Sequence, residues 1–240
     1  MSIDPKPQEA PRLLSADGRR ARCAVSTRPQ YSLGEVVADA VVHGLGVAAG
    51  LVGLVVLIAV VAPRYDIATG ASLWVYGFAM LTVFCFSAAY NLINDPTWTP
   101  RLRRLDRAAI YVKIAGTYTP FSAIAIGGGV GAGLLGVAWS IAAIGVPIAL
   151  FASERLERLT VWLYLAQGWL LVFVLEPISA ALPLEALVLL ISGGLLYTAG
   201  VPFHLWERLP YHNAIWHGFV LAASVCMYAA ILSGMPPALA

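Results

Sequence analysis

The sequence predicts an all-α polytopic membrane protein, a bundle of seven transmembrane helices with its N-terminus in the cytoplasm and its C-terminus outside. Three observations predict this fold: the composition, the length of the apolar runs and the distribution of basic residues. Of the 240 residues, 60% are hydrophobic and only 12% are charged, whereas soluble domains are about a quarter charged. One soluble core does not need this excess, but a protein in lipid must also have an apolar outer surface.

Seven apolar runs are long enough to cross the hydrocarbon layer, which takes about 20 apolar residues in a helix. They lie near residues 36–62, 68–93, 107–127, 130–152, 159–178, 184–203 and 212–233. Only the glycines from Gly127 to Gly129 divide the third run from the fourth, so six helices is the competing count. A single helix of about 45 residues does not fit one bilayer, and three glycines suit a tight turn.

Basic residues then orient the chain. Of the 15 Lys and Arg residues, the segments that seven spans place on the N-terminal side hold all but two. Those two are Arg64, on the opposite side, and Lys113, inside the third helix, where we expect its long side chain to reach the inner interface. Because cytoplasmic segments carry the excess of Lys and Arg, the N-terminus is predicted to be cytoplasmic.

The chain divides into three parts. We expect a flexible basic cytoplasmic tail over residues 1–30, a transmembrane domain over 31–235 and a short external tail over 236–240. The basic tail lacks the early apolar segment of a secretory signal. The formal net charge of +2 is too small to indicate a nucleic-acid binder, and Cys23, Cys85 and Cys226 have no zinc-finger spacing.

Polar residues gather at the predicted cytoplasmic end of the bundle, although each of them is costly inside a membrane. In the first helix Glu35, Asp39 and His43 are spaced four residues apart and so share one face. The other members come from the second, third and seventh helices: Ser87, Asn91, Asp106, Asn213 and His217. Independent placement would scatter these residues in depth, so their convergence is the strongest indication of a site in the residues themselves.

The residues alone leave two interpretations of this site open. Two side chains at i and i+4 on a helix can hold one metal ion, and such an ion can lower the pKa of a bound water and polarise a carbonyl. Asp106 would then act as the general base or orient that water. In the other interpretation the same residues form a polar network that holds the helix ends together.

At these residues the sequence resembles the haemolysin III family, within the larger group that includes the progestin and adiponectin receptors and the alkaline ceramidases. The resemblance covers roughly residues 31–235. It rests on Tyr31-Ser-Leu-Gly-Glu35 through His43-Gly44, Ser87-x-x-Tyr90, Leu102-Arg-Arg-Leu-Asp106 through Ile110-Tyr111, Ala115-Gly-Thr-Tyr-Thr-Pro120, Gly193-Gly194-Leu-Leu-Tyr197-Thr198, and Arg208-Leu-Pro-Tyr-His212 through Ile215-Trp216-His217.

The resemblance implies seven helices in the same orientation and a zinc site near the cytoplasmic leaflet. In the family three histidines bind the zinc, and a serine and an aspartate support the metal-bound water. Carried over, the ligand positions are Asn91, Asn213 and His217, and the supporting positions, which would serve catalysis, are Ser87 and Asp106.

The sequence departs from the family at these positions. Two of the three ligand positions hold asparagine, whose amide oxygen is a poor zinc ligand, and Arg107 replaces a histidine that is common beside the aspartate. Asp39 replaces a common asparagine and restores one negative charge. His43 and His212 are candidate substitutes, although His212 lies about 140° around the helix from His217. We therefore expect zinc to be weakly bound, altered or absent.

Three functions follow as hypotheses. The first is an integral membrane protein of a bacterial plasma membrane that acts on or responds to membrane lipids through the polar site, without catalysis. The second is a zinc-dependent lipid amide hydrolase, similar to a ceramidase. The third is a pore-forming cytolysin, which the family name suggests but which would need polar residues to recur along the whole bundle. Membrane lipids are the expected partners in each case.

Overall fold

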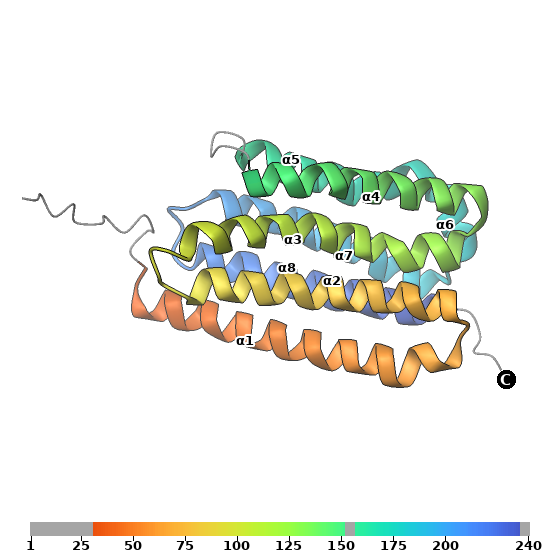
Figure 1. Ribbon diagram of the computed structural model, residues 1–240, viewed down its shortest axis with the longest axis horizontal. Coiled ribbons are helices and arrows are strands. Elements are labelled where there is room, and N and C mark those ends of the chain that lie inside the picture. The colour runs from red at the N-terminus through yellow and green to blue at the C-terminus, as the bar shows by residue number, and fades with distance from the viewer. Residues whose placement is uncertain (1–30, 152–156, 236–240) are drawn as a thin grey trace, which may run out of the picture. The chain divides into compact units, whose positions relative to one another are not determined.

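The structure, a computed structural model, describes residues 31–151 and 157–235 (Figure 1). These residues are almost entirely helical, and no strand occurs among them. The tails predicted over 1–30 and 236–240 lie outside the described residues and stay predictions.

The helices follow one another with short connections. In chain order they are α1 (Leu33–Val56), continued by η1 (Leu57–Val61) and η2 (Ala62–Arg64); α2 (Ile67–Leu92); α3 (Thr99–Pro120), continued by η3 (Phe121–Ile126); α4 (Gly128–Phe151); α5 (Glu157–Gly168), η5 (Trp169–Val174) and α6 (Leu175–Ala181) in one line; α7 (Leu184–Leu205); and α8 (His212–Ser233).

Within the described part of the chain, 6 helical segments are long and apolar enough to cross a membrane. The seventh, α3, is more polar because basic residues and Asp106 occupy its first turns, yet it packs closely against both α2 and α4. The prediction of a seven-helix membrane protein is therefore confirmed.

The turn between the third and fourth spans explains why the count is seven. Gly127 and Gly128 have φ angles of 62° and 56°, in the left-handed region that glycine enters without a steric penalty. The helix of η3 ends at Ile126 and α4 starts at Gly128. The competing count of six helices is wrong.

The third helix begins earlier than residue 107, where the apolar run begins. Asp95 accepts hydrogen bonds from the backbone N–H groups of Thr97 and Trp98, at 2.7 and 3.1 Å, just before α3 starts at Thr99. Arg101, which precedes the apolar run, therefore lies in the first turn of a helix. The apolar run marks only the part of the helix that lies in the hydrocarbon layer, whereas the helix itself begins before that layer.

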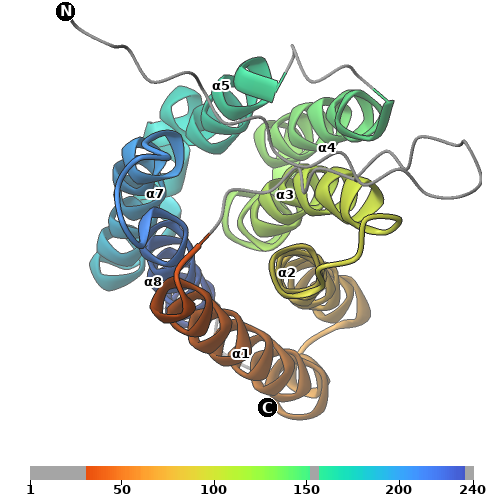
Figure 2. The ribbon, with the colours of Figure 1, turned by 90° about the vertical axis from the view of Figure 1, so that its left-hand side faces the viewer.

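The order of packing brings four helix ends together. In Figure 2, α1 lies between α2 and α8, and α3 follows α2 around the bundle; the closest helix pairs include α1 with α2, α2 with α3, and α7 with α8. Alternating chain direction then places the starts of α1, α3 and α8 and the end of α2 at one end of the bundle. The predicted polar residues lie at these four helix ends.

Lys113 does not reach the interface as we expected. Its side chain is 5% exposed and donates a hydrogen bond to the hydroxyl of Tyr197 on α7, across the bundle. The expectation considered only the length of the side chain, whereas the direction in which α3 presents residue 113 is set by packing.

Candidate functional site

Asp39 lies at the centre of a buried hydrogen-bond network at this end of the bundle. Its carboxylate accepts a hydrogen bond from Nδ1 of His217 at 2.8 Å and another from the amide of Asn213 at 3.1 Å. Its backbone carbonyl, and at 3.5 Å its carboxylate, face Nδ1 of His43 one turn further along α1. One residue of α1 thus positions two imidazoles and an amide.

The partners of the two Nδ1 atoms determine which nitrogen of each imidazole carries the proton. A carboxylate and a carbonyl can only accept, so Nδ1 is the protonated nitrogen of both His217 and His43 when the rings are neutral. The Nε2 atoms then present lone pairs, and both face the hydroxyl of Ser87, at 3.4 Å from His217 and 3.2 Å from His43. The ring centroids are 4.2 Å apart.

Around Ser87 the hydrogen-bond acceptors outnumber the donors. Asp106, near the start of α3, lies close enough to interact with Ser87, with His217 and with the charge of Arg107. Its carboxylate and the two Nε2 atoms are three acceptors. The Ser87 hydroxyl and the amide of Asn91, 3.4 Å from Nε2 of His43, are the donors that face the Nε2 atoms, and the charge of Arg107 acts on Asp106. The site is therefore suited to a group that supplies hydrogen-bond donors or positive charge.

The two asparagines at the implied zinc-ligand positions are members of this network. The amide nitrogen of Asn213 donates both to Asp39 and, at 2.9 Å, to the amide oxygen of Asn91. Asn91 in turn donates to the backbone carbonyl of Ser87 at 2.9 Å. Each amide is thus engaged by its neighbours.

The start of α1 holds the connection between α7 and α8 above this network. Glu35 forms a capping box with Ser32, and its second carboxylate oxygen accepts the backbone N–H of Tyr211 at 3.0 Å. Tyr211 has a φ angle of 60°, which costs about 1–3 kcal/mol in a residue other than glycine. A hydrogen bond of 3.3 Å joins the hydroxyl of Tyr31 to Nε2 of His212, and burial raises the pKa of Tyr31.

The structure brings together Asp39, His43, Ser87, Asn91, Asp106, Asn213 and His217. It places Glu35 and His212 at the edge of this network, where His212 contacts Tyr31 and its own Nδ1 is buried without a partner. Sequence reasoning did not single out Tyr31 or Tyr211. Both lie in stretches that carry the family resemblance, Tyr31 in Tyr31-Ser-Leu-Gly-Glu35 and Tyr211 in Arg208-Leu-Pro-Tyr-His212. Their presence in these stretches was the available signal.

The donor set differs from the three histidines that the family resemblance implies. Two of those positions hold amides whose N–H groups point into the network, so the family's own zinc site does not fit. A different group fits better: one ligand atom from each of Asp39, His43 and His217 lies within 4.8 Å of the others. Two imidazoles and a carboxylate are a donor set that zinc accepts. His212 is not part of this group.

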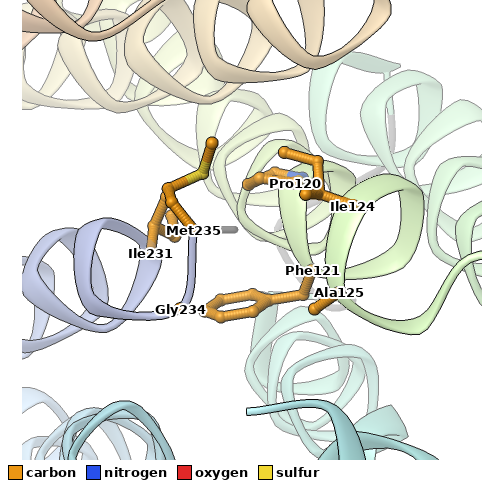
Figure 3. Close-up of a pocket in the computed structure, with 7 residues that line it drawn as sticks. All are labelled: Pro120, Phe121, Ile124, Ala125, Ile231, Gly234 and Met235. Carbon is orange, nitrogen blue, oxygen red and sulfur yellow. The ribbon is translucent and has the colours of Figure 1, made fainter. Parts of the chain in front are cut away.

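A pocket at the opposite end of the bundle has a different character. It is small and is lined by Pro120, Phe121, Ile124, Ala125, Ile231, Gly234 and Met235 (Figure 3). Pro120 lies fourteen residues beyond Asp106 on α3, about 21 Å along the helix. The lining is apolar, so this pocket does not continue the polar site.

Comparisons with known proteins find relatives that match most of the described helices. The family described as Haemolysin-III related matches residues 34–228. The chain is 36% identical over 203 residues to a hemolysin-3 homolog of Bacillus subtilis, covering 84% of this chain and 95% of that protein. It is 34% identical over 206 residues to hemolysin-3 of Bacillus cereus, covering 86% and 94%.

A more distant relative is the human monocyte to macrophage differentiation factor, 28% identical over 167 residues that cover 66% of this chain and 68% of that protein. No solved structure matches the chain. The match over nearly all of the helical bundle, together with two relatives aligned along almost their whole length, shows that this multi-pass membrane protein belongs to the haemolysin III family.

Proposed function

We propose that the protein acts on or responds to membrane lipids through the polar network of α1, α2, α3 and α8, which lies at the cytoplasmic face of a bacterial plasma membrane. The observation that carries this proposal is the excess of acceptors around Ser87. Two Nε2 lone pairs and the Asp106 carboxylate gather around one hydroxyl and one amide, and the charge of Arg107 acts on Asp106 from outside this group. Unsatisfied polar groups are expensive at membrane depth, so a ligand that donates hydrogen bonds stabilises this arrangement.

The chemistry of the network indicates the kind of headgroup that fits. Hydroxyl and amide N–H groups donate to imidazole and carboxylate, whereas ester and phosphate oxygens only accept. A lipid with a free hydroxyl or an amide N–H near its acyl chain presents these donors at the depth of Ser87. Asp39 contributes by orienting His43 and His217 through their Nδ1 atoms.

Lipid binding tests this proposal directly. The protein in nanodiscs of a zwitterionic phospholipid is offered an N-acyl lipid with a free hydroxyl, or the analogue methylated at oxygen and nitrogen, and complexes are counted by native mass spectrometry. Asp39→Asn should weaken binding of the first lipid by about tenfold, about 1.4 kcal/mol. The matched control is Asp66→Asn, the same change at a helix N-cap at the other end of the bundle. Equal binding of the two lipids would contradict the proposal.

A second candidate, the zinc-dependent lipid amide hydrolase, is favoured by one observation. The ligand atoms of Asp39, His43 and His217 lie within 4.8 Å of one another, so these residues would hold the ion. A bound zinc ion supplies Lewis acidity at such a site. Asp106 and Ser87 lie beside the group, where the carboxylate is placed to take a proton and the hydroxyl to bind a substrate oxygen.

Metal content separates the two candidates. Zinc is measured by mass spectrometry on the purified parent and on the Asn91→His, Asn213→His double variant, and amide cleavage is followed by release of fatty acid from a ceramide-like lipid. Stoichiometric zinc and cleavage in the parent would establish the hydrolase and overturn the non-catalytic proposal. Zinc gained only by the double variant would support a site that has lost its family ligands. The pore hypothesis gains no support from the far-end pocket, whose lining is apolar.

A further inference from the structure

A lysine lies in the interior of the bundle, away from the network described above. Lys113 is 5% exposed. It lies fourteen residues into a continuous helix that runs from Thr99 to Ile126, so it is about 21 Å along a rod of about 40 Å. This is close to the middle of the span, where a charged side chain is most costly and is a candidate functional group by default.

The contacts of Lys113 satisfy only part of its hydrogen-bonding capacity. Its ammonium donates to the hydroxyl of Tyr197 on α7 and lies beside the ring of that residue. Tyr197 shares a further hydrogen bond of 2.7 Å with the hydroxyl of Ser224 on α8, which is 2% exposed. An ammonium has three N–H donors, and among the described residues no carboxylate pairs with Lys113.

A second polar group in the same region is also unsatisfied. The side chain of Tyr76 on α2 is completely buried and its hydroxyl has no hydrogen-bond partner. Tyr76 interacts electrostatically with Tyr197 and Tyr228. Its ring lies 6.3 Å from that of Tyr228, whose hydroxyl is already committed to the backbone carbonyl of Gly53 at 3.0 Å. The hydroxyl of Tyr76 therefore belongs to the same interior region as the pair of Lys113 and Tyr197.

These groups together form a donor-rich and positively charged centre. The ammonium has spare N–H groups, and Tyr76 has a spare O–H. A buried charge without a counter-charge costs several kcal/mol, and an apolar side chain of similar volume avoids that cost. A methionine would fit the same helix without this penalty, so the lysine needs a partner that the described residues do not supply.

We propose that Lys113, Tyr197, Ser224 and Tyr76 form a binding site for a monovalent anion in the middle of the membrane. The site attracts the anion by charge through Lys113. It holds the anion by hydrogen bonds from the Tyr76 hydroxyl and from the one O–H of the Tyr197–Ser224 pair that their own hydrogen bond leaves free. The anion is either a halide or the carboxylate of a single-chain lipid, since both carry one negative charge and only accept hydrogen bonds.

This site is separate from the lipid network of the proposed function. Lys113 follows Asp106 by seven residues on α3, which is about 10 Å deeper along the helix, and the two sites share no residue. Their electrostatic character is also opposite, because acceptors are in excess around Ser87 and donors are in excess around Lys113. Either proposal can therefore fail without the other.

Anion-dependent stabilisation and direct binding test the proposal. The full-length protein in nanodiscs of zwitterionic lipid is titrated with sodium bromide or with sodium oleate. Sodium gluconate, a bulky anion, is the control for bromide. Methyl oleate, which lacks the charge, is the control for oleate. Unfolding is followed by tryptophan fluorescence and stoichiometry by native mass spectrometry.

The variants are Lys113→Met, which removes the charge at similar volume, and Tyr197→Phe, which removes one hydroxyl. Arg104→Met, at an exposed position of the same helix, controls for surface charge.

The expected result is a saturable shift with one anion per chain, weakened about tenfold or more in Lys113→Met, less in Tyr197→Phe and not at all in Arg104→Met. Bromide alone would identify a halide site, and oleate alone a lipid carboxylate site. Lys113→Met should fold at least as well as the parent, because it loses an uncompensated buried charge. A parent that binds neither anion, or a Lys113→Met variant that binds as tightly as the parent, would overturn the proposal.

Discussion

Asp39 shows how a single residue organises the network. Its carboxylate and its backbone carbonyl receive Nδ1 of His217 and of His43, so both rings turn their Nε2 atoms toward Ser87. A partner on one ring nitrogen fixes the tautomer and orientation of an imidazole. Asparagine at position 39 could not accept hydrogen bonds from both His217 and Asn213, because its amide would present an N–H group to one of them.

We predict that both histidines are Nδ1–H tautomers when neutral. Nitrogen-15 spectra of histidine-labelled protein should show unprotonated Nε2 atoms for His43 and His217. Asp39→Asn should convert His217 to a mixture of tautomers and leave His43 largely unchanged, because the carbonyl at position 39 is retained. His204 lies outside the network and serves as the reference signal. An Nε2–H tautomer of His217 in the parent protein would show that Asp39 does not orient it.

Much of the network could be predicted from spacing, and the rest depends on tertiary contacts. Residues four apart on a helix share a face, which groups Asp39 with His43 and Asn213 with His217. Spacing does not show that Tyr211 adopts a φ of 60° so that its backbone N–H reaches Glu35. Nor does it show the direction of Lys113, whose partner Tyr197 is 84 residues away in the chain.

At the scale of a helix, the glycines of α4 show what small residues do in this bundle. A methyl group added at Gly145 would lie 2.4 Å from the ring of Tyr111, which is completely buried and packs against Tyr164. At Gly136 of the same helix the methyl would meet nothing within 4 Å. The sequence shows both as glycines in an apolar run, and only the packed structure distinguishes a contact with α3 from an open position.

We therefore predict opposite effects of two identical substitutions in α4. Gly145→Ala should destabilise the protein by about 1–3 kcal/mol, since the buried ring of Tyr111 has little room to move. Gly136→Ala should stabilise it by up to about 1 kcal/mol, because alanine has the higher helix propensity. Thermal unfolding in one detergent or nanodisc measures both. Equal shifts for the two variants would indicate that α3 and α4 do not pack closely at Gly145.

The N-cap of α2 leads to a prediction about pH. Asp66 accepts hydrogen bonds from the backbone of Ala68 and from the backbone and hydroxyl of Thr69, and the hydroxyl of Thr69 is the largest cause that lowers the Asp66 pKa below 3.8. A carboxyl whose pKa is lower in the folded state stabilises the fold at pH values above its unfolded-state pKa. This stabilisation is lost as the pH falls through the folded-state pKa. Asp66→Ala should lower the Tm at pH 7, and the difference should narrow as the pH falls through the lowered pKa of Asp66, where the parent carboxyl gains a proton. Asp66→Asn keeps an acceptor and should remain near the parent at pH 7; a pH-independent Asp66→Ala effect would contradict the prediction.

At the scale of the whole molecule, hydropathy together with the glycines from Gly127 to Gly129 predicted the number of helices, because each helix that crosses the lipid needs an apolar surface of limited length. It misplaced the start of α3, where Arg101, Arg103 and Arg104 extend the helix beyond the apolar run. It did not show how the helices close into a bundle with α1 between α2 and α8. That arrangement turns polar residues separated by more than 170 positions, such as Asp39 and His217, into neighbours.

The orientation of the bundle is the last prediction, and the location of the network in the cell depends on it. Arg101 and Arg208 lie near the same end of the bundle as Asp39, whereas Arg64 lies at the other end, as the last residue of η2. Because Lys and Arg are retained on the cytoplasmic side, alkaline phosphatase fused after Ser233 should be active outside the cell membrane. The same enzyme fused after Arg208 should be inactive. The reverse pattern would place Ser87 and Asp39 at the outer leaflet, and the donor-bearing lipid of the proposed function would then have to reach the site from outside.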